Sequence, residues 1–503
     1  MKNLREKCKA SFVKNKYNIC IFIVMVIFSL IICTNFLKPH FALDTYCVYA
    51  HDTNVQIEHF LVSNRIFSAF AVWLSKALNI SFFTYMKLLN LAGVVFLAAS
   101  WFILYKFVIA ITKKQSNVFY NILIAGISFS IIYNFCTVES LLFWESGVMC
   151  LGILCTIIGS CVFNSNIKYK RIISFFDLLI GSTCYQGAIT IYIPLTLVLL
   201  AYKHKEHIRN IFIESIKVGF IYFLVMIINL FATKIFSNMF NYEFRKMDVL
   251  SIPEILNTVV RLGYDMIVQT FGIGPKYWYV LTIIAISIIF LIYIFKKQKS
   301  KFYILEYIVL VATCTIIPIL PMLATPVESQ YLETRMAMSF GSSLGILILF
   351  LVLVVEIHKY NILKELTIIL ISLMMLLNAM YYVMAASENK VTNYLDGNIA
   401  KTIIKEIYDY EKETNIKVEN IGVACDKNPI NHYDGQRWLG VITTRSMGTE
   451  WAAIETIEFY SGEHFNQTEV PNEHKEEFLQ KNWDSFDKEQ LIFEGNNLYI
   501  CMY

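Results

Sequence analysis

Long apolar runs, separated by short polar segments, dominate the first three quarters of the chain. Runs of about bilayer length cover 18–37, 88–111, 118–135, 142–163, 215–235, 277–295, 303–323, 338–357 and 364–385. A helix of about 20 apolar residues crosses the roughly 30 Å hydrocarbon core of a bilayer. Each run is therefore predicted to be a transmembrane helix.

A further apolar stretch, 172–201, has basic clusters on both sides. Lys and Arg concentrate in cytoplasmic loops, so both ends of this stretch are expected on the same side of the membrane. We therefore predict two short helices that turn at the outer face near Tyr185 and Gln186. The alternative, one long tilted span, would invert every later loop. With the hairpin, the prediction is about eleven spans.

The basic residues also predict the orientation of the chain. Six of them precede the first run, and no small-residue cleavage site follows it. We interpret this run as a membrane anchor with a cytoplasmic N-terminus, because a signal peptide would carry such a site. The expected location is the plasma or inner membrane of a cell. The outer segments are then 38–87, 136–141, 236–276 and 324–337.

Two of these outer segments contain amphipathic stretches, at 59–78 and 254–272. Apolar residues recur there at helical spacing with polar residues opposite, which is typical of helices in the membrane interface. From about 386 onwards the chain becomes polar and charged. A helix over 394–413 and strands at 418–425 and 498–503 predict a small extracytoplasmic α/β domain in 386–503, after a membrane domain in 1–385.

Composition agrees with a membrane protein, since 56% of residues are hydrophobic and 16% are charged. Globular domains carry about 25% charged residues. The net charge of +4 is too small to indicate a nucleic-acid partner. Most of the twelve cysteines lie in apolar runs, where they act as small hydrophobic residues. Cys425 and Cys501 lie in the polar tail and could form a disulfide if that tail occupies an oxidising space.

The candidate catalytic residues are acids beside the outer ends of predicted spans. Asp44 and Asp52 follow the first span, and Glu139 lies in the second outer loop. A carboxylate in such a place can act as a general base on an acceptor hydroxyl, which typically contributes about 10²–10⁴-fold. The alternative is a solvated or interfacial acid, and we interpret Glu145 in that way.

Arg65 and Arg335 lie in or beside apolar stretches on the predicted outer side. A guanidinium there needs an anion, and arginine forms bidentate pairs with phosphate and carboxylate alike. Two interpretations stay open. These side chains either clamp a lipid-linked phosphate, or form salt bridges with acids such as Glu333 or Asp44.

Tyr185 and Gln186 interrupt the predicted hairpin at its turn, where Gln186 can hydrogen-bond a sugar or cap a helix end. His51 and His59 lie near the first outer acids, but their spacing matches no metal-binding motif. Walker, Rossmann, HExxH and GxSxG motifs are absent from the sequence. Nucleotide-driven transport and the common hydrolase chemistries are therefore without support.

Taken in order along 18–385, these features resemble the GtrII-type family of membrane glucosyltransferases, which modify O-antigen. The matching features are the acid after the first span (Asp44), the arginine of an amphipathic helix (Arg65), the second-loop acid (Glu139) and the Tyr185–Gln186 pair. The resemblance implies an α-helical polytopic fold, with a GT-C-like bundle of about eleven spans, interfacial helices and the small C-terminal domain.

The resemblance also implies an activity. A sugar, glucose by default, would move on the outer face from a polyprenyl-phosphate-linked donor to a surface glycan such as O-antigen. The implied partners are this donor, the glycan acceptor and the lipid bilayer, with no nucleic acid. The implied site comprises the catalytic acids Asp44, Asp52 and Glu139, the phosphate-binding Arg65 and Arg335, and the substrate-binding Tyr185 and Gln186.

The sequence departs from the family pattern in two places. The family commonly has two adjacent acids where this chain has Asp44 and Thr45, and its Gly-Arg-Pro-like turn reads Asn64-Arg65-Ile66 here. No cofactor or catalytic metal is expected, because arginine can supply the counter-charge. A divalent ion held by Asp44 with Asp52 or Glu139 is the alternative.

Three other functions would give the sequence different features. A lipid-linked oligosaccharide flippase predicts charges buried in the middle of spans and two pseudo-symmetric halves. A surface-polysaccharide polymerase predicts one dominant, arginine-rich outer loop. A passive receptor predicts that the acids of the first outer loop are replaceable.

Overall fold

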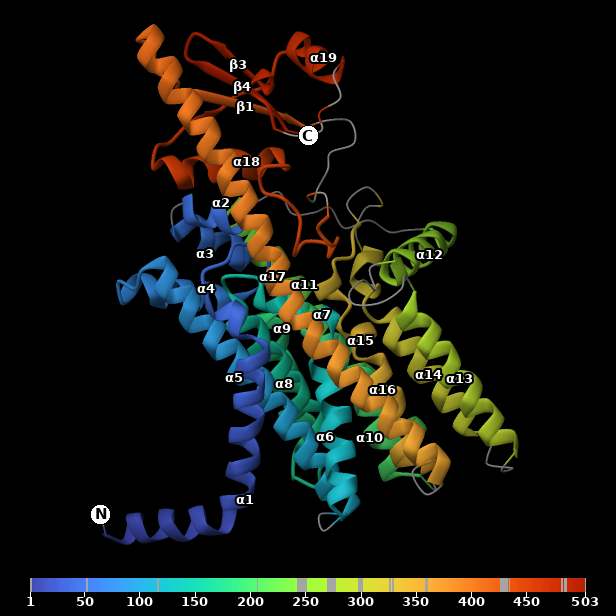
Figure 1. Cartoon of the computed structure of the whole chain (residues 1–503). Helices are drawn as coiled ribbons and strands as arrows, with labels where there is room; N and C mark the ends of the chain where they lie inside the picture. Colours follow the sequence, from blue (N-terminus) through green and yellow to red (C-terminus); the bar gives the residue numbers. More distant parts are fainter. Residues whose placement is uncertain are drawn as a thin grey trace.

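The computed structural model of the chain describes residues 2–50, 53–114, 117–205, 207–241, 251–268, 277–296, 302–324, 327, 330–357, 361–425, 433, 435–480, 483 and 486–502. Figure 1 shows a helical bundle with a smaller C-terminal domain beyond one of its ends. We call this end of the bundle the domain end.

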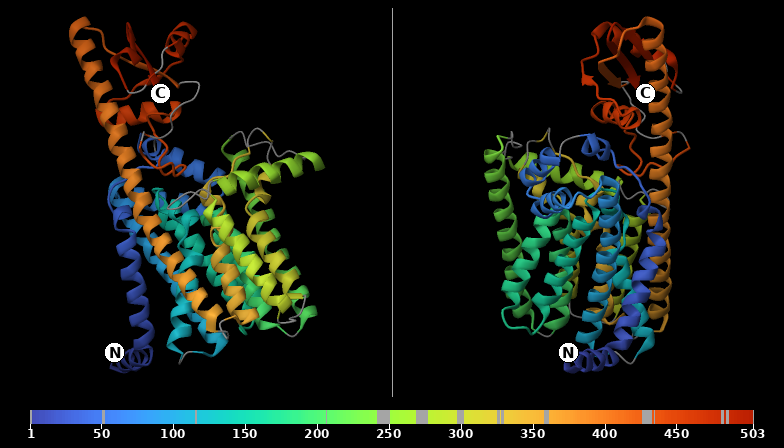
Figure 2. Two further views of the ribbon diagram at one scale, coloured as in Figure 1. Left: turned by 45° about the vertical axis from the view of Figure 1, so that its right-hand side comes forward. Right: turned by 90° about the vertical axis from the view of Figure 1, so that its left-hand side faces the viewer.

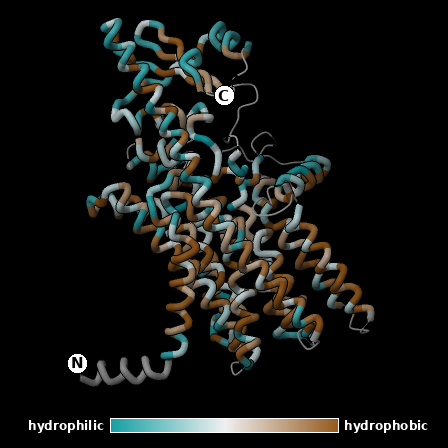
Figure 3. Tube along the Cα trace, in the orientation of Figure 1, coloured by the Kyte–Doolittle hydropathy of each residue, from teal (hydrophilic) through white to brown (hydrophobic). Residues whose placement is uncertain are grey.

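Eleven helices build the bundle in the described part of the chain. They are α1 (Lys2–Ile32), α5 (Phe82–Thr112), α6 (Val118–Ile132), α8 (Ser146–Asn164), α9 (Lys170–Cys184), α10 (Tyr192–Lys203), α11 (Ile208–Met239), α13 (Trp278–Lys296), α14 (Phe302–Ile316), α16 (Ser343–Phe350) and α17 (Asn361–Thr414). Apolar residues cover the bundle along its length (Figure 3). Large side chains such as Phe220, Phe231 and Phe295 are exposed on its outside. An apolar exterior of this kind suits a lipid environment, and the helices satisfy their own backbone groups.

The number of spans differs from the prediction. Among the described residues, six helices are long and apolar enough to cross a membrane, or seven if the bent pair formed by α6 with 135–141 counts as one span. The prediction of about eleven spans is therefore not confirmed. The difference arises because several predicted runs are interrupted: α16, for example, gives way to a π-helical turn, η7 (Leu351–Val355), that ends at left-handed Glu356. The architecture is compatible with an α-helical membrane protein.

The stretch 172–201 is broken where the sequence indicates. Helix α9 ends at Cys184, Tyr185 adopts an extended conformation, and the 3₁₀ segment η3 (Gln186–Ile191) leads into α10. Helices α8 and α9 approach closely at two glycines, since a Cβ on Gly181 would lie 3.2 Å from the Gly152 carbonyl oxygen. Small residues permit such backbone contact between helices. The break places Tyr185 at the end of the hairpin.

Short elements cover the domain end. They are η1 (Thr34–Leu37), α2 (Thr45–Ala50), α3 (Thr53–Val62), α4 (Ile66–Ala77), α7 (Phe135–Val138), η2 (Glu139–Leu141), α12 (Ile252–Val268), η4 (Leu320–Ala324), η6 (Thr334–Met336) and α15 (Met338–Gly341). The predicted amphipathic stretch 59–78 lies in α3 and α4, and the other, 254–272, lies in α12 as far as Val268, while 269–272 are outside the described residues. Helix α12 lies across the domain end of α13 and α14 in the views of Figures 1 and 2. Residue Asn64, at φ 53°, makes the turn between α3 and α4, a conformation that asparagine tolerates better than most residues.

The C-terminal domain is carried by α17, which runs without a break from the bundle into the domain (Figure 2). The predicted domain boundary at 385/386 therefore falls inside a continuous helix. The described part of the domain holds β1 (Asn420–Cys425), β2 (Asn466–Gln467), β3 (Leu491–Glu494) and β4 (Asn497–Met502), in the order β2-β1-β4-β3. Strand β4 pairs with β1 in parallel and with β3 in the antiparallel direction. Helices α18 (Glu450–Ser461) and α19 (Asn472–Gln480) complete it.

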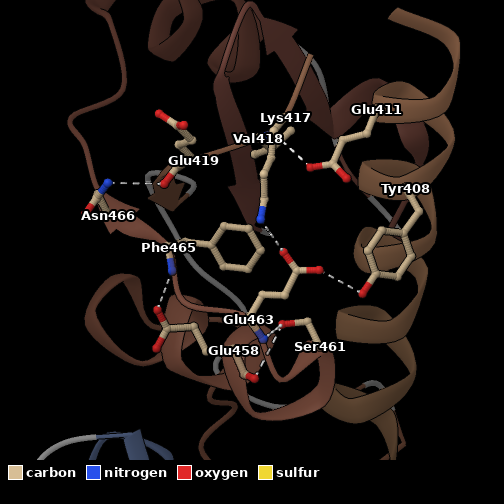
Figure 4. A network of polar contacts seen from close by, with 10 residues as sticks. All are labelled: Tyr408, Glu411, Lys417, Val418, Glu419, Glu458, Ser461, Glu463, Phe465 and Asn466. Atoms are coloured by element: carbon tan, nitrogen blue, oxygen red, sulfur yellow. Dashed lines mark hydrogen bonds and ion pairs between the residues drawn. The ribbon is translucent and has the colours of Figure 1, made fainter. Parts of the chain in front are cut away.

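Polar contacts join α17, the segment before β1 and the segment after α18 within this domain (Figure 4). The Tyr408 hydroxyl donates to Glu463 at 3.2 Å, and Lys417 pairs with the same carboxylate at 3.4 Å. The Phe465 amide donates to Glu458 at 2.8 Å. The domain is thus fastened to the end of α17.

The disulfide between Cys425 and Cys501, which the sequence left open, is not formed. Strands β1 and β4 pair so that Cys501 lies opposite Ala424 and Cys425 lies opposite Met502. Successive side chains of a strand point to opposite faces of the sheet. Cys425 and Cys501 therefore lie on different faces, in different apolar clusters, and a disulfide cannot join them.

Candidate functional site

Two cavities lie next to each other at the domain end. The larger, of about 430 Å³, is lined by Tyr185, Gln186 and Arg335 together with apolar residues of α11 and of the segment before η6. The smaller, of about 230 Å³, is lined by Asp44 and Glu145 among others. Arg65 and His59 border both cavities. A ligand in either cavity would meet the Arg65 guanidinium.

Arg335 is held by Glu139 at the wall of the larger cavity. The Arg335 guanidinium donates to Glu139 Oε1, and the Arg335 backbone amide donates to Oε2 at 3.1 Å. The guanidinium also lies over the Phe143 ring, 4.4 Å from its centroid. Glu139 is fully buried, and both of its oxygens are bound to one residue. Its carboxylate therefore fixes the position of Arg335.

Arg65 is held in a similar way by Glu145. Arg65 lies at the start of α4, directly after the left-handed Asn64, and its guanidinium approaches Glu145 Oε1 to 3.2 Å. Tyr185 lies on the other side, with its ring centroid 5.2 Å from the guanidinium carbon. Burial raises the pKa of Glu145 to about 7, although Arg65 opposes this shift. Near neutral pH, Glu145 therefore exists in both protonation states.

Asp44 faces the smaller cavity from the turn between η1 and α2. Its Oδ1 atom is buried and has no hydrogen-bond partner among the described residues. Arg65 Nε and Glu145 Oε2, which belong to the same cavity wall, are likewise buried without a partner in that part of the structure. Burial raises the pKa of Asp44, while the charges of Arg335 and Arg65 lower it. Such orphaned polar atoms mark a place where a polar ligand can bind.

Gln186 and Gly187 connect the hairpin turn to its surroundings. The Gln186 side-chain amide donates to the Ser63 carbonyl at 2.9 Å, so it satisfies a carbonyl at the end of α3. A Cβ on Gly187 would lie 2.7 Å from the Arg335 carbonyl oxygen. Glycine therefore permits the close approach of η3 and η6 that brings Tyr185 and Arg335 to one cavity.

The structure thus brings most of the predicted site residues to one place, at the walls of the two cavities or directly behind them: Asp44, Arg65, Glu139, Tyr185, Gln186 and Arg335. Asp52 and His51 lie outside the described residues. Of the two interpretations left open for the arginines, the structure shows salt bridges, although their partners are Glu139 for Arg335 and Glu145 for Arg65.

The interpretation of Glu145 as an interfacial acid is wrong, because its side chain is buried and paired with Arg65. The sequence feature that could have identified Glu145 as a site residue was its position near the start of a predicted span, six residues after Glu139. His59, considered in the sequence as a metal ligand, instead borders both cavities. Within the described ranges, no three His, Cys, Asp or Glu side chains gather closely enough to hold a metal ion.

The chemistry available at this site follows from its charges. Two guanidinium groups, and two carboxylates that each have one oxygen without a hydrogen-bond partner in the described structure, lie around adjoining cavities and are partly shielded from water. Charged groups act more strongly on a ligand in such a place than in bulk solvent. The larger cavity combines its cations with an apolar wall formed by residues such as Met226, Leu230 and Met322. It is therefore suited to an anion with an apolar substituent.

Comparison of the chain with protein-family models, with curated proteins and with solved structures found no match.

Proposed function

We propose that the protein is a membrane glycosyltransferase of the GT-C-like type, which moves a sugar from a polyprenyl-phosphate-linked donor to a hydroxyl of a surface glycan. The observation that carries the proposal is the juxtaposition of Asp44 and Arg65 in the smaller cavity, with Asp44 Oδ1 lacking a protein hydrogen bond in the described structure. A base and a phosphate clamp side by side are the groups that this reaction needs.

The donor phosphate is assigned to the larger cavity, between Arg65 and Arg335. Arginine binds phosphate oxygens through paired hydrogen bonds and keeps its charge at any physiological pH. The apolar side chains of Met226, Leu230 and Met322 offer a surface for the start of the lipid tail. In this proposal, the lipid-linked donor enters the larger cavity from the membrane, at the outer ends of the spans.

In the reaction, the acceptor hydroxyl oxygen attacks the anomeric carbon of the donor sugar, and its proton passes to Asp44. The bond between the anomeric carbon and the phosphate oxygen breaks, and its electron pair leaves with the polyprenyl phosphate. Arg65 and Arg335 stabilise the charge that develops on this leaving group. The raised pKa of Asp44 makes the carboxylate a stronger base than a solvated aspartate.

Glu139 has a different role in this proposal from the one expected for it. Both of its oxygens are bound to Arg335, so it orients the clamp and does not accept the acceptor proton. Glu145 contacts Arg65 through one oxygen only, so the ionised carboxylate competes with the donor phosphate for this guanidinium. Tyr185 contributes its ring face to Arg65, at 5.2 Å from the guanidinium carbon.

The proposal includes a topology of eleven spans. The helices that satisfy the length and hydropathy criteria are completed by the bent pair at α6, by α9 and by the shorter apolar helices 16–32, 302–316 and 343–355. With a cytoplasmic N-terminus, an odd number of spans places the site and the C-terminal domain outside the cell. The acceptor glycan is available there.

The test is sugar transfer by the purified chain in lipid nanodiscs, from synthetic polyprenyl-phosphate hexoses to a lipid-linked or soluble glycan. The Asp44→Asn variant is expected to lose at least about 100-fold in kcat, in line with the loss of a general base. The control is Asp177→Asn, because Asp177 lies on α9, has a buried carboxylate oxygen and lines neither cavity. Transfer by the Asp44→Asn variant at the rate of this control would overturn the assignment.

A further inference from the structure

The segment that carries Asp44, residues 38–50, is fastened by parts of the chain far from it in sequence. Between η1 and α2 it has no regular secondary structure, so its backbone groups need other partners. The Phe41 amide donates to Asn393 Oδ1 at 2.9 Å, and the Asn393 side-chain amide donates back to the Phe41 carbonyl at 3.0 Å. Asn393 thus binds both backbone groups of one residue, three positions before Asp44.

Asn389, one helical turn earlier on α17, strengthens this contact. Its amide group donates to the Phe41 carbonyl at 3.0 Å and to the Ile442 carbonyl of the C-terminal domain at 2.9 Å. One buried side chain therefore connects the segment 38–50, α17 and the domain. Buried hydrogen bonds of this kind are costly to break, because the groups left behind lose their partners.

Helix α18 holds the same segment by aromatic contacts. The Phe459 ring meets Phe41, Tyr46 and Tyr49 edge-on, with centroid distances of 5.0, 5.4 and 5.0 Å. On the same face of α18, the Trp451 carbonyl accepts a hydrogen bond from the Cys47 thiol at 3.7 Å. Aromatic pairs in these arrangements contribute about 0.5–1.5 kcal/mol beyond the area that they bury.

We propose that α17 and the C-terminal domain position the Asp44 carboxylate, with Asn393 and Phe459 as positioning residues. This inference rests on the proposed function. Asp44 Oδ1 has no protein hydrogen bond of its own in the described structure, so the direction of the carboxylate depends on how its backbone is held. The domain then contributes to catalysis through this contact, without touching the substrate.

The expected kinetic effect is confined to the chemical step. In the Asn393→Ala variant, we expect kcat to fall on the order of 10- to 100-fold, because small displacements of a catalytic group are costly. The donor KM stays within about twofold, since the side-chain hydrogen bonds of Asn393 go to Phe41 and not to the arginines that bind phosphate. Asn398→Ala is the matched control, because Asn398 is an exposed residue of the same helix.

The acid limb of the pH–rate profile supplies a second readout. Among the described residues, the charged and titratable groups that act on Asp44 or face it are Arg335, Arg65, His59, Glu145 and Cys47. When the segment loosens, Asp44 gains water and its raised pKa falls towards the ordinary value. The acid limb of the Asn393→Ala variant therefore moves to lower pH. A general loss of folded protein would lower the rate without moving this limb.

A third readout needs no activity. Cys47 is half-buried against α18, so loosening of the segment should increase the rate at which a maleimide labels it, measured by mass spectrometry of the Cys47 peptide. Phe459→Leu, which keeps an apolar side chain but loses the ring contacts, serves if Asn393→Ala does not fold. Faster labelling with lower kcat and a shifted acid limb supports the inference. Unchanged labelling, or unchanged kcat in a variant that labels faster, overturns it.

The two proposals fail in distinguishable ways. If the unmodified chain transfers no sugar from any polyprenyl-phosphate hexose, the proposed function is overturned, and labelling of Cys47 still measures whether α17 and α18 hold the segment. If the unmodified chain is active and Asn393→Ala matches Asn398→Ala in all three readouts, the function stands and the positioning role does not.

Discussion

Two cationic and three acidic side chains lie around the two cavities. The guanidinium groups are those of Arg65 and Arg335, and the carboxyl groups are those of Asp44, Glu139 and Glu145. Arg335 and Glu139 form a closed pair, since both carboxylate oxygens are engaged. Arg65 is held by a single contact to Glu145, whose second oxygen has no partner within the described structure. Arg65 is therefore the cation that is most available to form hydrogen bonds with a bound phosphate.

This arrangement predicts a pH dependence of donor binding. Burial raises the pKa of Glu145 to about 7. Below that pH the group is neutral and leaves Arg65 to the phosphate, and above it the ionised carboxylate competes for the same guanidinium. A phosphodiester keeps its single negative charge over this range. We expect the donor KM of the unmodified protein to rise as pH increases through about 7, measured by transfer kinetics between pH 6 and 8.

The Glu145→Gln variant provides the contrast for this prediction. The amide cannot ionise, so the donor KM should stay flat across the same pH range and close to the low-pH value of the unmodified protein. A KM that still rises through pH 7 in this variant would assign the titration to another group, such as His59, which also borders both cavities.

At the scale of elements, the site depends on the contact between two short 3₁₀ segments, η3 and η6. The backbone of Gly187 in η3 approaches the backbone of Arg335 in η6, where a Cβ would lie 2.7 Å from the Arg335 carbonyl oxygen. A Cβ there would also lie 2.5 Å from the Tyr185 ring. Backbone and a buried ring cannot give way as the end of a flexible side chain can.

The Gly187→Ala variant should therefore displace Arg335 from the larger cavity. We expect a donor KM higher by about tenfold or more, since the phosphate clamp loses its geometry, and a loss of stability of about 1–3 kcal/mol from overpacking. Transfer kinetics and thermal unfolding measure the two effects. Gly219→Ala in α11 is the control, because a Cβ at Gly219 meets no described atom within 4 Å. Equal donor KM values for the two variants would contradict the prediction.

At the scale of the molecule, α17 is the element that unites the bundle and the C-terminal domain (Figure 1). It leaves the bundle at the domain end and reaches beyond it, where the sheet and α18 pack against it. The same helix supplies Asn389 and Asn393 to the segment that carries Asp44. A domain connected to the bundle by one continuous helix has a defined orientation relative to it. This suits the proposed role of the domain in positioning the segment that carries Asp44.

The proposed topology predicts that the two ends of the chain lie on opposite sides of the membrane. We expect a tag after Tyr503 to be accessible to antibody or protease in intact cells or spheroplasts, and a tag before Met1 to become accessible only after permeabilisation. Both tags on the same side would require an even number of spans. The domain end would then have to be reassigned together with the proposed acceptor.

The sequence by itself determined where most helices lie, because lipid-exposed and buried faces are both apolar and leave long readable runs. The break at Tyr185, the helices α3–α4 and α12, and the strands at 420–425 and 497–502 fall where the patterns indicate. The candidate acids and arginines were also found from sequence, since ionisable residues stand out beside apolar runs. The number of spans was not determined, because interruptions such as the π-helical turn after α16 depend on packing.

Tertiary structure alone decided which charges meet. Arg65 and Glu145 are separated by 80 residues, Arg335 and Glu139 by 196, and Phe41 and Asn393 by 352. A hydropathy pattern carries information about the period and length of each helix, but none about which helix lies beside which. Which acid pairs with which arginine at the site follows from the packing of whole helices. The same packing causes the burial that raises the pKa of Glu145.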